Sequence, residues 1–183
     1  MARTAALVLA AGEGRRFGGP KAPFVLDGER LVDRAVRILR DAGCDPVVVV
    51  LGAWVGDVPD ADVVVENEGW SEGMGSSLRT GLEALARDAD DDVGAALVSL
   101  VDLVGLTSVA VARVLACEAS PAAAAYDGRR GHPVRFARES WAEVAAHAHG
   151  DVGARDYLAA HAPVLVEVGD LASGDDLDLA PPG

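Results

Sequence analysis

Short, almost wholly apolar runs recur along the chain, separated by stretches in which apolar and polar residues mix. Runs of this kind are typical of strands that are buried on both faces of a parallel sheet. We therefore predict strands over 5–10, 46–51 and 95–101, a shorter strand over 62–66 that contains three valines, and a last strand over 164–168.

Helices are predicted between these strands, where apolar side chains return every three or four residues. Thr107 is a typical N-cap, and Ser76 or Ser77 could cap the helix that starts there. Gly43 is a typical stop signal after the first helix. The predicted helices cover 31–42, 76–86, 107–116, 140–147 and 153–161.

One segment departs from the alternation of strand and helix. The turn signal over 127–131 separates two strand-like stretches at 122–126 and 132–136, which predicts an antiparallel hairpin. The whole pattern predicts a single α/β domain over 1–183, a Rossmann-like three-layer sandwich with a mostly parallel sheet. Residues from about 170 to 183 are rich in Asp, Gly and Pro, and we expect them to form a flexible tail.

Composition narrows the classes of function. With 183 residues the chain can bury a real core, and because only 4% of it is aromatic, that core should consist mainly of Val, Leu and Ala. The formal net charge of −13 argues against a nucleic-acid-binding surface, and we expect the acidic stretch 88–92 to be a solvated loop. Cys44 and Cys117 have no metal-like spacing and are expected to be reduced, partly buried thiols of a cytoplasmic protein. We expect no signal peptide and no membrane span, since no apolar run approaches about 18 residues.

The first predicted strand runs directly into a cationic, glycine-rich loop. Residues 9–21 read LAAGEGRRFGGPK, and Lys21 is the only lysine beside 15 arginines in the chain. Backbone N–H groups at the end of such a strand can face an anion, while Arg15, Arg16 and Lys21 add the charge that a triphosphate needs. This loop is the first candidate for the working site.

Two familiar glycine motifs do not fit this loop. A dinucleotide fingerprint would need a small residue where Phe17 stands, and an acid at the end of the second strand, which ends at Leu51. Gly14 and Gly19 have P-loop spacing, but the lysine and hydroxyl that should follow directly are missing.

Asp102 follows the strand over 95–101. The carboxyl end of a central strand is where ligands bind in such sheets, and where the glycine-rich loop should also open. Beside a bound triphosphate a bare carboxylate would repel the ligand, and a Mg²⁺ ion between them would remove the conflict. Alternatively, Asp102 simply caps the following turn or helix, and its position alone leaves both interpretations open.

The loop over 9–21 resembles the signature L-A-A-G-x-G-x-R-x-G-x-x-K of the MobA/MocA-like nucleotidyltransferases. Residues 67–82, 131–134 and 150–155 are similar to the molybdenum-cofactor cytidylyltransferase branch, and the resemblance runs from about residue 4 to 180. It implies the fold of the nucleotide-diphospho-sugar transferases. It also implies a Mg²⁺-dependent transfer of NMP from an NTP to a phosphate-bearing acceptor, with release of pyrophosphate.

The resemblance also implies roles for individual residues. Arg16 and Lys21 would contact the phosphates, and Asp102 would hold Mg²⁺ with Asp178 as a second ligand, or Asp176 in its place. The catalytic residues would then be Arg16, Lys21 and Asp102. The residues implied to hold the nucleotide are Leu9, Ala10, Ala11, Gly12, Gly14 and Lys21, with Gly73, Ser76 and Ser77 at the base and ribose.

The implied partners are an NTP and a phosphorylated small molecule. CTP is favoured with GTP as the alternative, and molybdopterin is the implied acceptor, with no role for nucleic acid or a membrane. A phosphosugar, a phospholactate-like acid or methylerythritol phosphate would suit the same chemistry. A nucleotide-binding carrier or regulator with little catalysis is the alternative from another class.

Two departures from the family pattern bear on these roles. The family usually has a proline two residues after the metal-binding Asp, where this chain has Val104, and the tail motif D-I-D-T-P is matched only in part at 176–181. Elsewhere, Trp70 either packs its loop onto the core or stacks on a ligand. Arg129 and Arg130 are either solvated at the hairpin turn or help to hold an anionic acceptor.

Overall fold

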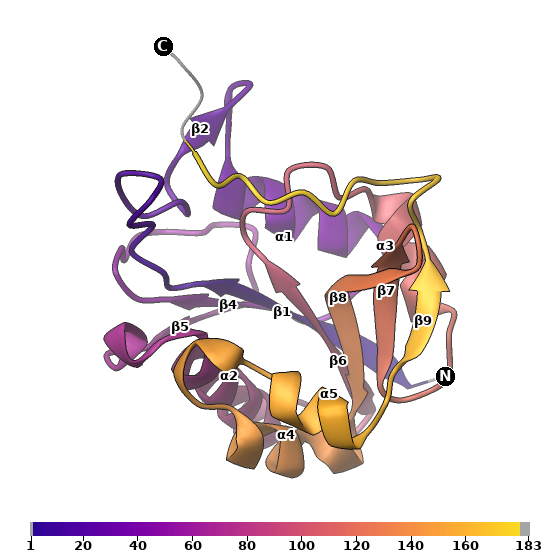
Figure 1. Ribbon diagram of the computed structural model, residues 1–183. Coiled ribbons are helices and arrows are strands. Elements are labelled where there is room, and N and C mark those ends of the chain that lie inside the picture. Colours follow the sequence, from indigo (N-terminus) through magenta and orange to yellow (C-terminus); the bar gives the residue numbers. More distant parts are fainter. Residues whose placement is uncertain (1, 180–183) are drawn as a thin grey trace.

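A seven-stranded sheet runs through the computed structural model, which describes residues 2–179 (Figure 1). The strand order is β5-β4-β1-β6-β8-β7-β9, and β8 alone runs against the other six. A separate two-stranded hairpin is formed by β2 and β3. The strands are β1 (Arg3–Ala10), β2 (Val25–Leu26), β3 (Glu29–Arg30), β4 (Val47–Leu51), β5 (Val63–Glu66), β6 (Val93–Leu100), β7 (Ala122–Tyr126), β8 (Arg129–Ala137) and β9 (Val164–Glu167).

Helices cover both faces of this sheet, so the predicted three layers and the hairpin are confirmed. One face carries α1 (Leu31–Asp41) and α3 (Ser108–Leu115). The opposite face carries α2 (Met74–Asp88), α4 (Trp141–His147) and α5 (Arg155–Ala160). Short 3₁₀ turns are η1 (Trp70–Glu72), η2 (Arg138–Ser140) and η3 (Gly150–Val152).

The central strands are mostly apolar because they supply two cores at once. In β1, Ala5, Leu7 and Leu9 face the core under α2, α4 and α5, whereas Ala6 and Val8 face the core under α1 and α3. Successive side chains of a strand point to opposite faces, so a strand covered on both sides is apolar almost throughout. Ser99 of β6 is the exception, since it is buried and its hydroxyl has no hydrogen-bond partner within residues 2–179.

The order of the strands defines where a ligand can bind. From β1 the chain moves outward through β4 to β5, and then returns to place β6 on the other side of β1. The gap between the carboxyl ends of β1 and β6 is therefore a topological switch point, the usual ligand site of open parallel sheets. The glycine-rich loop follows β1 and Asp102 follows β6, so both lie at this point.

The predicted caps are confirmed in two places and wrong in one. The hydroxyl of Thr107 accepts a hydrogen bond from the N–H of Ala110 at 3.2 Å, and α1 ends before Gly43 at φ +99°. Ser76 and Ser77 do not cap α2, because the helix begins at Met74 and both serines are buried inside its first turn.

The hairpin turn is tighter than the pattern predicted. It consists of two residues, Asp127 and Gly128, at φ +52° and +74°, instead of the five over 127–131. Positive φ at both positions of a two-residue loop is typical of a type I′ turn, which matches the twist of the flanking strands. As a result Arg129 and Arg130 lie in β8 itself, opposite β7.

The acidic stretch 88–92 is not simply solvated, as had been expected. The guanidinium of Arg3 donates to Asp92 at 2.7 Å and 2.8 Å and to Asp90 at 2.8 Å. It also donates to Asp45 at 2.7 Å. One arginine on the first strand thus gathers carboxylates from two distant loops, and part of the acidic run joins the fold.

The segment 169–178, which we call the strap, lies against the loop after β6 instead of standing free as the tail prediction expected (Figure 1). The N–H of Ser173 donates to the carbonyl of Gly105 at 3.2 Å, and that of Leu177 donates to the carbonyl of Asp102 at 3.1 Å. Asp176 forms an isolated antiparallel bridge with Leu103. The last residues of the predicted tail, 180–183, lie outside the described residues.

Two smaller expectations concern cysteines and membranes. Cys44 is buried, Cys117 is partly exposed, and both are free thiols. Within residues 2–179 there is no helix with the length and apolar character that crossing a membrane requires.

Candidate active site

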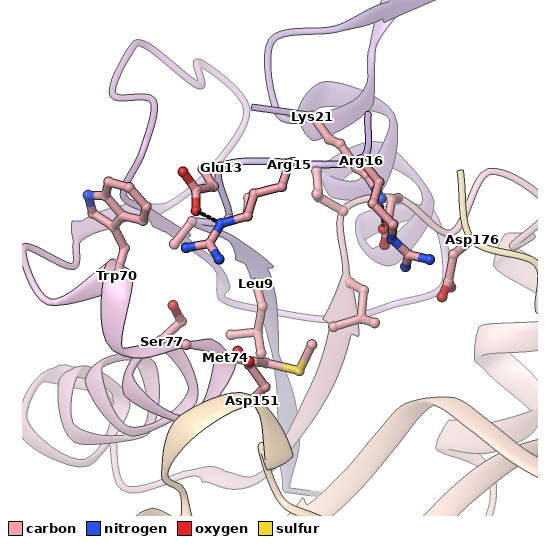
Figure 2. A pocket seen from close by; sticks show the side chains of 18 of the residues that line it. Leu9, Glu13, Arg15, Arg16, Lys21, Trp70, Met74, Ser77, Asp151 and Asp176 are labelled. Atoms are coloured by element: carbon pink, nitrogen blue, oxygen red, sulfur yellow. Dashed lines mark hydrogen bonds and ion pairs between the residues drawn. The ribbon is translucent and has the colours of Figure 1, made fainter. Parts of the chain in front are cut away.

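A cavity of about 580 Å³ opens at the switch point, and we call it the switch-point cavity. Its walls come from the loop after β1, the start of α2 with η1, the residues after β6, η3 and the strap (Figure 2). Eleven of the twelve site residues named from the sequence line it: Leu9, Ala10, Ala11, Gly12, Gly14, Arg16, Lys21, Gly73, Ser77, Asp102 and Asp178. Ser76 does not.

The loop after β1 presents unused backbone donors to this cavity. Within residues 2–179, the N–H groups of Gly12, Glu13 and Gly14 donate no hydrogen bond to any other residue. The loop closes on itself, because the N–H groups of Gly18 and Gly19 both donate to the carbonyl of Gly14, at 2.8 Å and 3.2 Å. Gly14 has φ +61°, and a Cβ there would lie 2.0 Å from the carbonyl oxygen of Gly19. Only glycine fits this position, and the resulting cradle of N–H groups suits an anion.

Lys21 and Asp102 meet inside the cavity. The ammonium of Lys21 donates to a carboxylate oxygen of Asp102 at 2.7 Å, and each side chain is only 16% exposed. The sequence predicted that the loop and the acid would converge on one site, and this contact confirms it. Lys21 also lies 5.9 Å from the ring of Phe17, which packs edge-to-face on Phe24 and fixes the end of the loop.

The two arginines of the loop are much more exposed than the lysine. The side chain of Arg15 is 82% exposed and pairs with Glu13, its near neighbour (Figure 2). Arg16 is 77% exposed and donates to Asp178 of the strap at 3.1 Å. Because exposed pairs contribute little, both guanidinium groups can exchange these partners for an incoming anion.

The start of α2 forms the floor of the cavity. Gly73 caps the helix at φ +107° and ψ −177°, a conformation open to glycine almost alone, and no side chain occupies the free N–H groups of the first turn. Ser77 lines the cavity, whereas the hydroxyl of Ser76 donates to the carbonyls of Gly69 and Gly73 and accepts from Asn67. Ser76 therefore shapes the wall without reaching the cavity.

Three carboxylates lie on the side of the cavity near the strap. Asp102 and Asp176 belong to segments joined by the bridge at Leu103, and Asp178 is turned toward Arg16. Burial raises the pKa of Asp176, and the charges of Asp102 and Asp178 raise it further. Carboxylate oxygens are ligands that Mg²⁺ prefers. Within residues 2–179 no three His, Cys, Asp or Glu side chains are grouped to hold a metal unaided, so phosphate oxygens and water would complete its shell.

His132 lies next to this site. Burial lowers its pKa to about 4, Arg130 lowers it further and Asp102 opposes the shift, so the imidazole is neutral at pH 7. The hydroxyl of Tyr126 donates to the carbonyl of His132 at 2.8 Å. His132 is a residue of β8, and its burial there would make a charged imidazole costly.

Sequence reasoning missed several lining residues. Glu13, Glu72, Met74 and Asp151 all line the cavity. The signal for Asp151 was present, since it falls in the 150–155 segment that resembles the family, but only the folded chain brings η3 to the start of α2. Trp70 packs against the core, and it also lines the cavity, so stacking on a ligand stays a prediction.

Residues 6–164 match the family described as the MobA-like NTP transferase domain. The chain belongs to this family. The match includes the loop after β1, α2 and Asp102, and it ends before the strap.

Two relatives of the chain are named for different reactions. The chain is 37% identical to the nicotine blue oxidoreductase of Paenarthrobacter nicotinovorans over 190 residues, which is 94% of this chain and 90% of the relative. It is 56% identical to the probable molybdenum cofactor guanylyltransferase of Opitutus terrae over 46 residues, which is 25% of this chain and 23% of the relative. Membership of the family therefore does not define the reaction, which has to be inferred from the site of each protein.

Solved structures confirm the fold. An Rv0371c homologue from Mycobacterium sp. strain JC1 superposes with a TM-score of 0.77 at 25% identity, covering 97% of this chain and 91% of that one. A nucleotidyl transferase from Methanothermobacter gives a TM-score of 0.73 at 19% identity, covering 97% and 92%. The predicted α/β fold of the nucleotide-diphospho-sugar transferase type is the one observed.

Proposed function

We propose that this protein is a Mg²⁺-dependent nucleotidyltransferase that moves NMP from an NTP, with CTP favoured over GTP, to molybdopterin or a similar phosphorylated acceptor. The proposal rests mainly on one observation. Lys21, Asp102 and the unpaired N–H groups of Gly12, Glu13 and Gly14 all face the same cavity.

The proposed chemistry needs no general base among the side chains. An oxygen of the acceptor phosphate, already an anion, attacks the α-phosphorus of the NTP, and the bond between the α-phosphorus and the bridging oxygen breaks to release pyrophosphate. The N–H groups of the loop hold the phosphates in line, while Lys21 and Arg16 stabilise the charge that develops on the leaving group. Asp102, with Asp176 or Asp178, would hold Mg²⁺, which supplies further charge neutralisation at the phosphates.

The balance of charge supports a divalent cation. Among residues 2–179, six carboxylates line the switch-point cavity but only three cations do, Arg15, Arg16 and Lys21. A triphosphate that entered this cavity alone would meet a net negative wall. A Mg²⁺ ion held by these carboxylates would offset most of that excess, and it would leave the Lys21 ammonium able to contact a phosphate in place of Asp102.

The choice of base rests on the resemblance and not on side chains at the site. Residues 67–82 and 150–155 are similar to the cytidylyltransferase branch, whereas one relative is named as a guanylyltransferase. We keep CTP as the favoured nucleotide and the cytoplasm as the expected compartment.

A second candidate is an oxidoreductase activity, which the 37% identity to nicotine blue oxidoreductase favours. A nucleotide cavity also suits the nucleotide part of a redox cofactor. Against it, Phe17 occupies a position where a dinucleotide fingerprint needs a small residue, and β4 ends without an acid.

Pyrophosphate release separates the two candidates. We expect the purified protein to release pyrophosphate from CTP or GTP only when Mg²⁺ and molybdopterin are both present, and Lys21→Met to abolish the release. Arg87→Gln, an exposed change far along α2, is the matched control and should keep wild-type rates. No release with any NTP and acceptor, together with oxidation of NADPH or NADH by nicotine blue, would favour the oxidoreductase.

A further inference from the structure

A second cavity of about 470 Å³ lies between the β7–β8 hairpin and the strap, and we call it the hairpin cavity. The hairpin contributes Tyr126, Asp127, Arg129 and Arg130 to its lining, and the strap contributes residues between 169 and 175. It shares no lining residue with the switch-point cavity, so it is a separate place where part of a ligand can bind.

The hairpin wall of this cavity is held in a fixed shape. Glu167 of β9 accepts hydrogen bonds from the N–H groups of Asp127 and Gly128, at 3.0 Å and 2.8 Å. The ring of Tyr126 packs against the strap so closely that a Cβ on Gly174 would lie 2.6 Å from it. These contacts hold the backbone next to Arg129 and Arg130 in place.

Arg129 and Arg130 have unused donors in this cavity. Nine of the 15 arginines form ion pairs, yet within residues 2–179 the side chains of Arg129 and Arg130 form neither an ion pair nor a hydrogen bond. Asp127 and Asp175 line the same cavity but do not pair with them. Both arginines line the cavity, and guanidinium groups are suited to binding a phosphate or a carboxylate.

The hairpin cavity adjoins the proposed reaction site. Asp175 lines the hairpin cavity and the next residue, Asp176, lines the switch-point cavity, so one stretch of the strap separates the two. A small molecule that bound in both cavities would pass this stretch of the strap.

We propose that the hairpin cavity binds an anionic group of the acceptor, remote from the phosphate that attacks, through Arg129 and Arg130. The acceptor would then belong to a defined class: small molecules that carry a terminal phosphate and, remote from it, a second anionic group. This inference rests on the proposed nucleotidyl transfer, because it assigns the second substrate of that reaction.

The binding test uses inorganic phosphate as the probe and the full chain. Phosphate is titrated into ¹⁵N-labelled protein, and NMR shifts are followed at Gly128, Gly131 and Gly174 of the hairpin cavity and at Gly12 and Gly14 of the other cavity. We expect a saturable shift at the first three glycines, and malonate titrated in parallel tells whether a carboxylate binds more tightly than a phosphate.

Variants that remove positive charges and a variant that removes a negative charge should change phosphate affinity in opposite directions. Arg129→Gln with Arg130→Gln should weaken phosphate binding at the hairpin glycines about tenfold or more, since each removes charge-assisted hydrogen bonds. Arg37→Gln with Arg87→Gln removes the same charge far from both cavities and should change little. Asp175→Asn removes a like charge and should strengthen binding a few-fold. Equal affinity in the Arg129/Arg130 double variant, or shifts confined to Gly12 and Gly14, would overturn the proposal.

Kinetics supply the second readout. With an acceptor that supports pyrophosphate release, the Arg129/Arg130 double variant should raise the KM for the acceptor at least tenfold, with the KM for the NTP changed less than twofold. A rise in the KM for the NTP alone would contradict the assignment. If wild-type protein releases no pyrophosphate, the proposed function fails while the phosphate titration still reports on the cavity, so the two failures are distinguishable.

Discussion

The Lys21–Asp102 ion pair should oppose metal binding in the protein without nucleotide. The ammonium lies 2.7 Å from the carboxylate, so a metal ion that takes Asp102 as a ligand must displace it. Exposed ion pairs contribute up to about 1 kcal/mol, whereas breaking a buried pair costs about 3–5 kcal/mol. With each side chain 16% exposed, we place this pair between the two, at about 1–2 kcal/mol. Lys21→Met should therefore bind Mn²⁺ about 5- to 30-fold more tightly than wild type.

Calorimetric titration with Mn²⁺ in the absence of nucleotide checks this value. Lys21→Arg keeps a cation beside Asp102 and should bind the ion like wild type, whereas Asp102→Asn should bind it more weakly. Unchanged or weaker binding in Lys21→Met would refute the reasoning, because it would mean that Asp102 is not a ligand or that the ammonium does not compete for it.

Lys21→Met should lower catalytic efficiency although it strengthens metal binding. Loss of a charged donor at the phosphates should lower kcat/KM about 10²- to 10³-fold. The accompanying loss of stability lowers Tm only by about 2–4 °C per kcal/mol in a chain of this size, which cannot account for such a loss of rate. Tighter Mn²⁺ binding together with a lower kcat/KM would show that the charge of Lys21 acts on catalysis directly. A loss of folding alone would lower both.

Three further predictions concern neighbouring groups. Gly73→Ala should destabilise the protein by about 1–3 kcal/mol in urea denaturation, because φ is +107° and the new Cβ would lie 2.5 Å from a carboxylate oxygen of Asp151. His132 has a folded pKa of about 4 against about 6.5 unfolded, so its contribution is complete above pH 6.5 and is lost as pH falls toward 4. His132→Gln should therefore remove about 2 kcal/mol of the stability difference between pH 7 and 4.5, and a control at an exposed histidine should not. Asp176→Asn should weaken Mn²⁺ binding about tenfold, and more than Asp178→Asn, because Asp176 belongs to the segment bridged to the loop after Asp102.

The sheet and the centre of the site could be predicted because they depend on local patterns and on general rules of topology. A wholly apolar run such as 5–10 can only be a strand with cores on both sides. Once β1 and β6 were expected to be parallel, the loop after β1 and Asp102 had to emerge at the same edge. The approach of Lys21 to Asp102 follows from that rule, although 81 residues separate them.

The contacts that were missed are long-range and polar. Residues 88–92 resemble a solvated charge run, and nothing nearby in sequence indicates that Arg3, 87 residues from Asp90, would gather them. Serines at the start of a helical pattern usually cap it, but Asn67 and the carbonyl of Gly73 bind Ser76 inside the helix instead. The strap lacks an apolar period, so its hydrogen bonds to the loop after β6 could not be anticipated from its composition.

The strap also has a thermodynamic consequence, because a single stretch of backbone borders both cavities. A ligand that shifted the backbone of Asp176 in one cavity would also shift that of Asp175 in the other, since the two share a peptide unit. Two such occupants would be energetically coupled, and the coupling would be reciprocal: whatever factor the first applies to the affinity of the second, the second returns to the first.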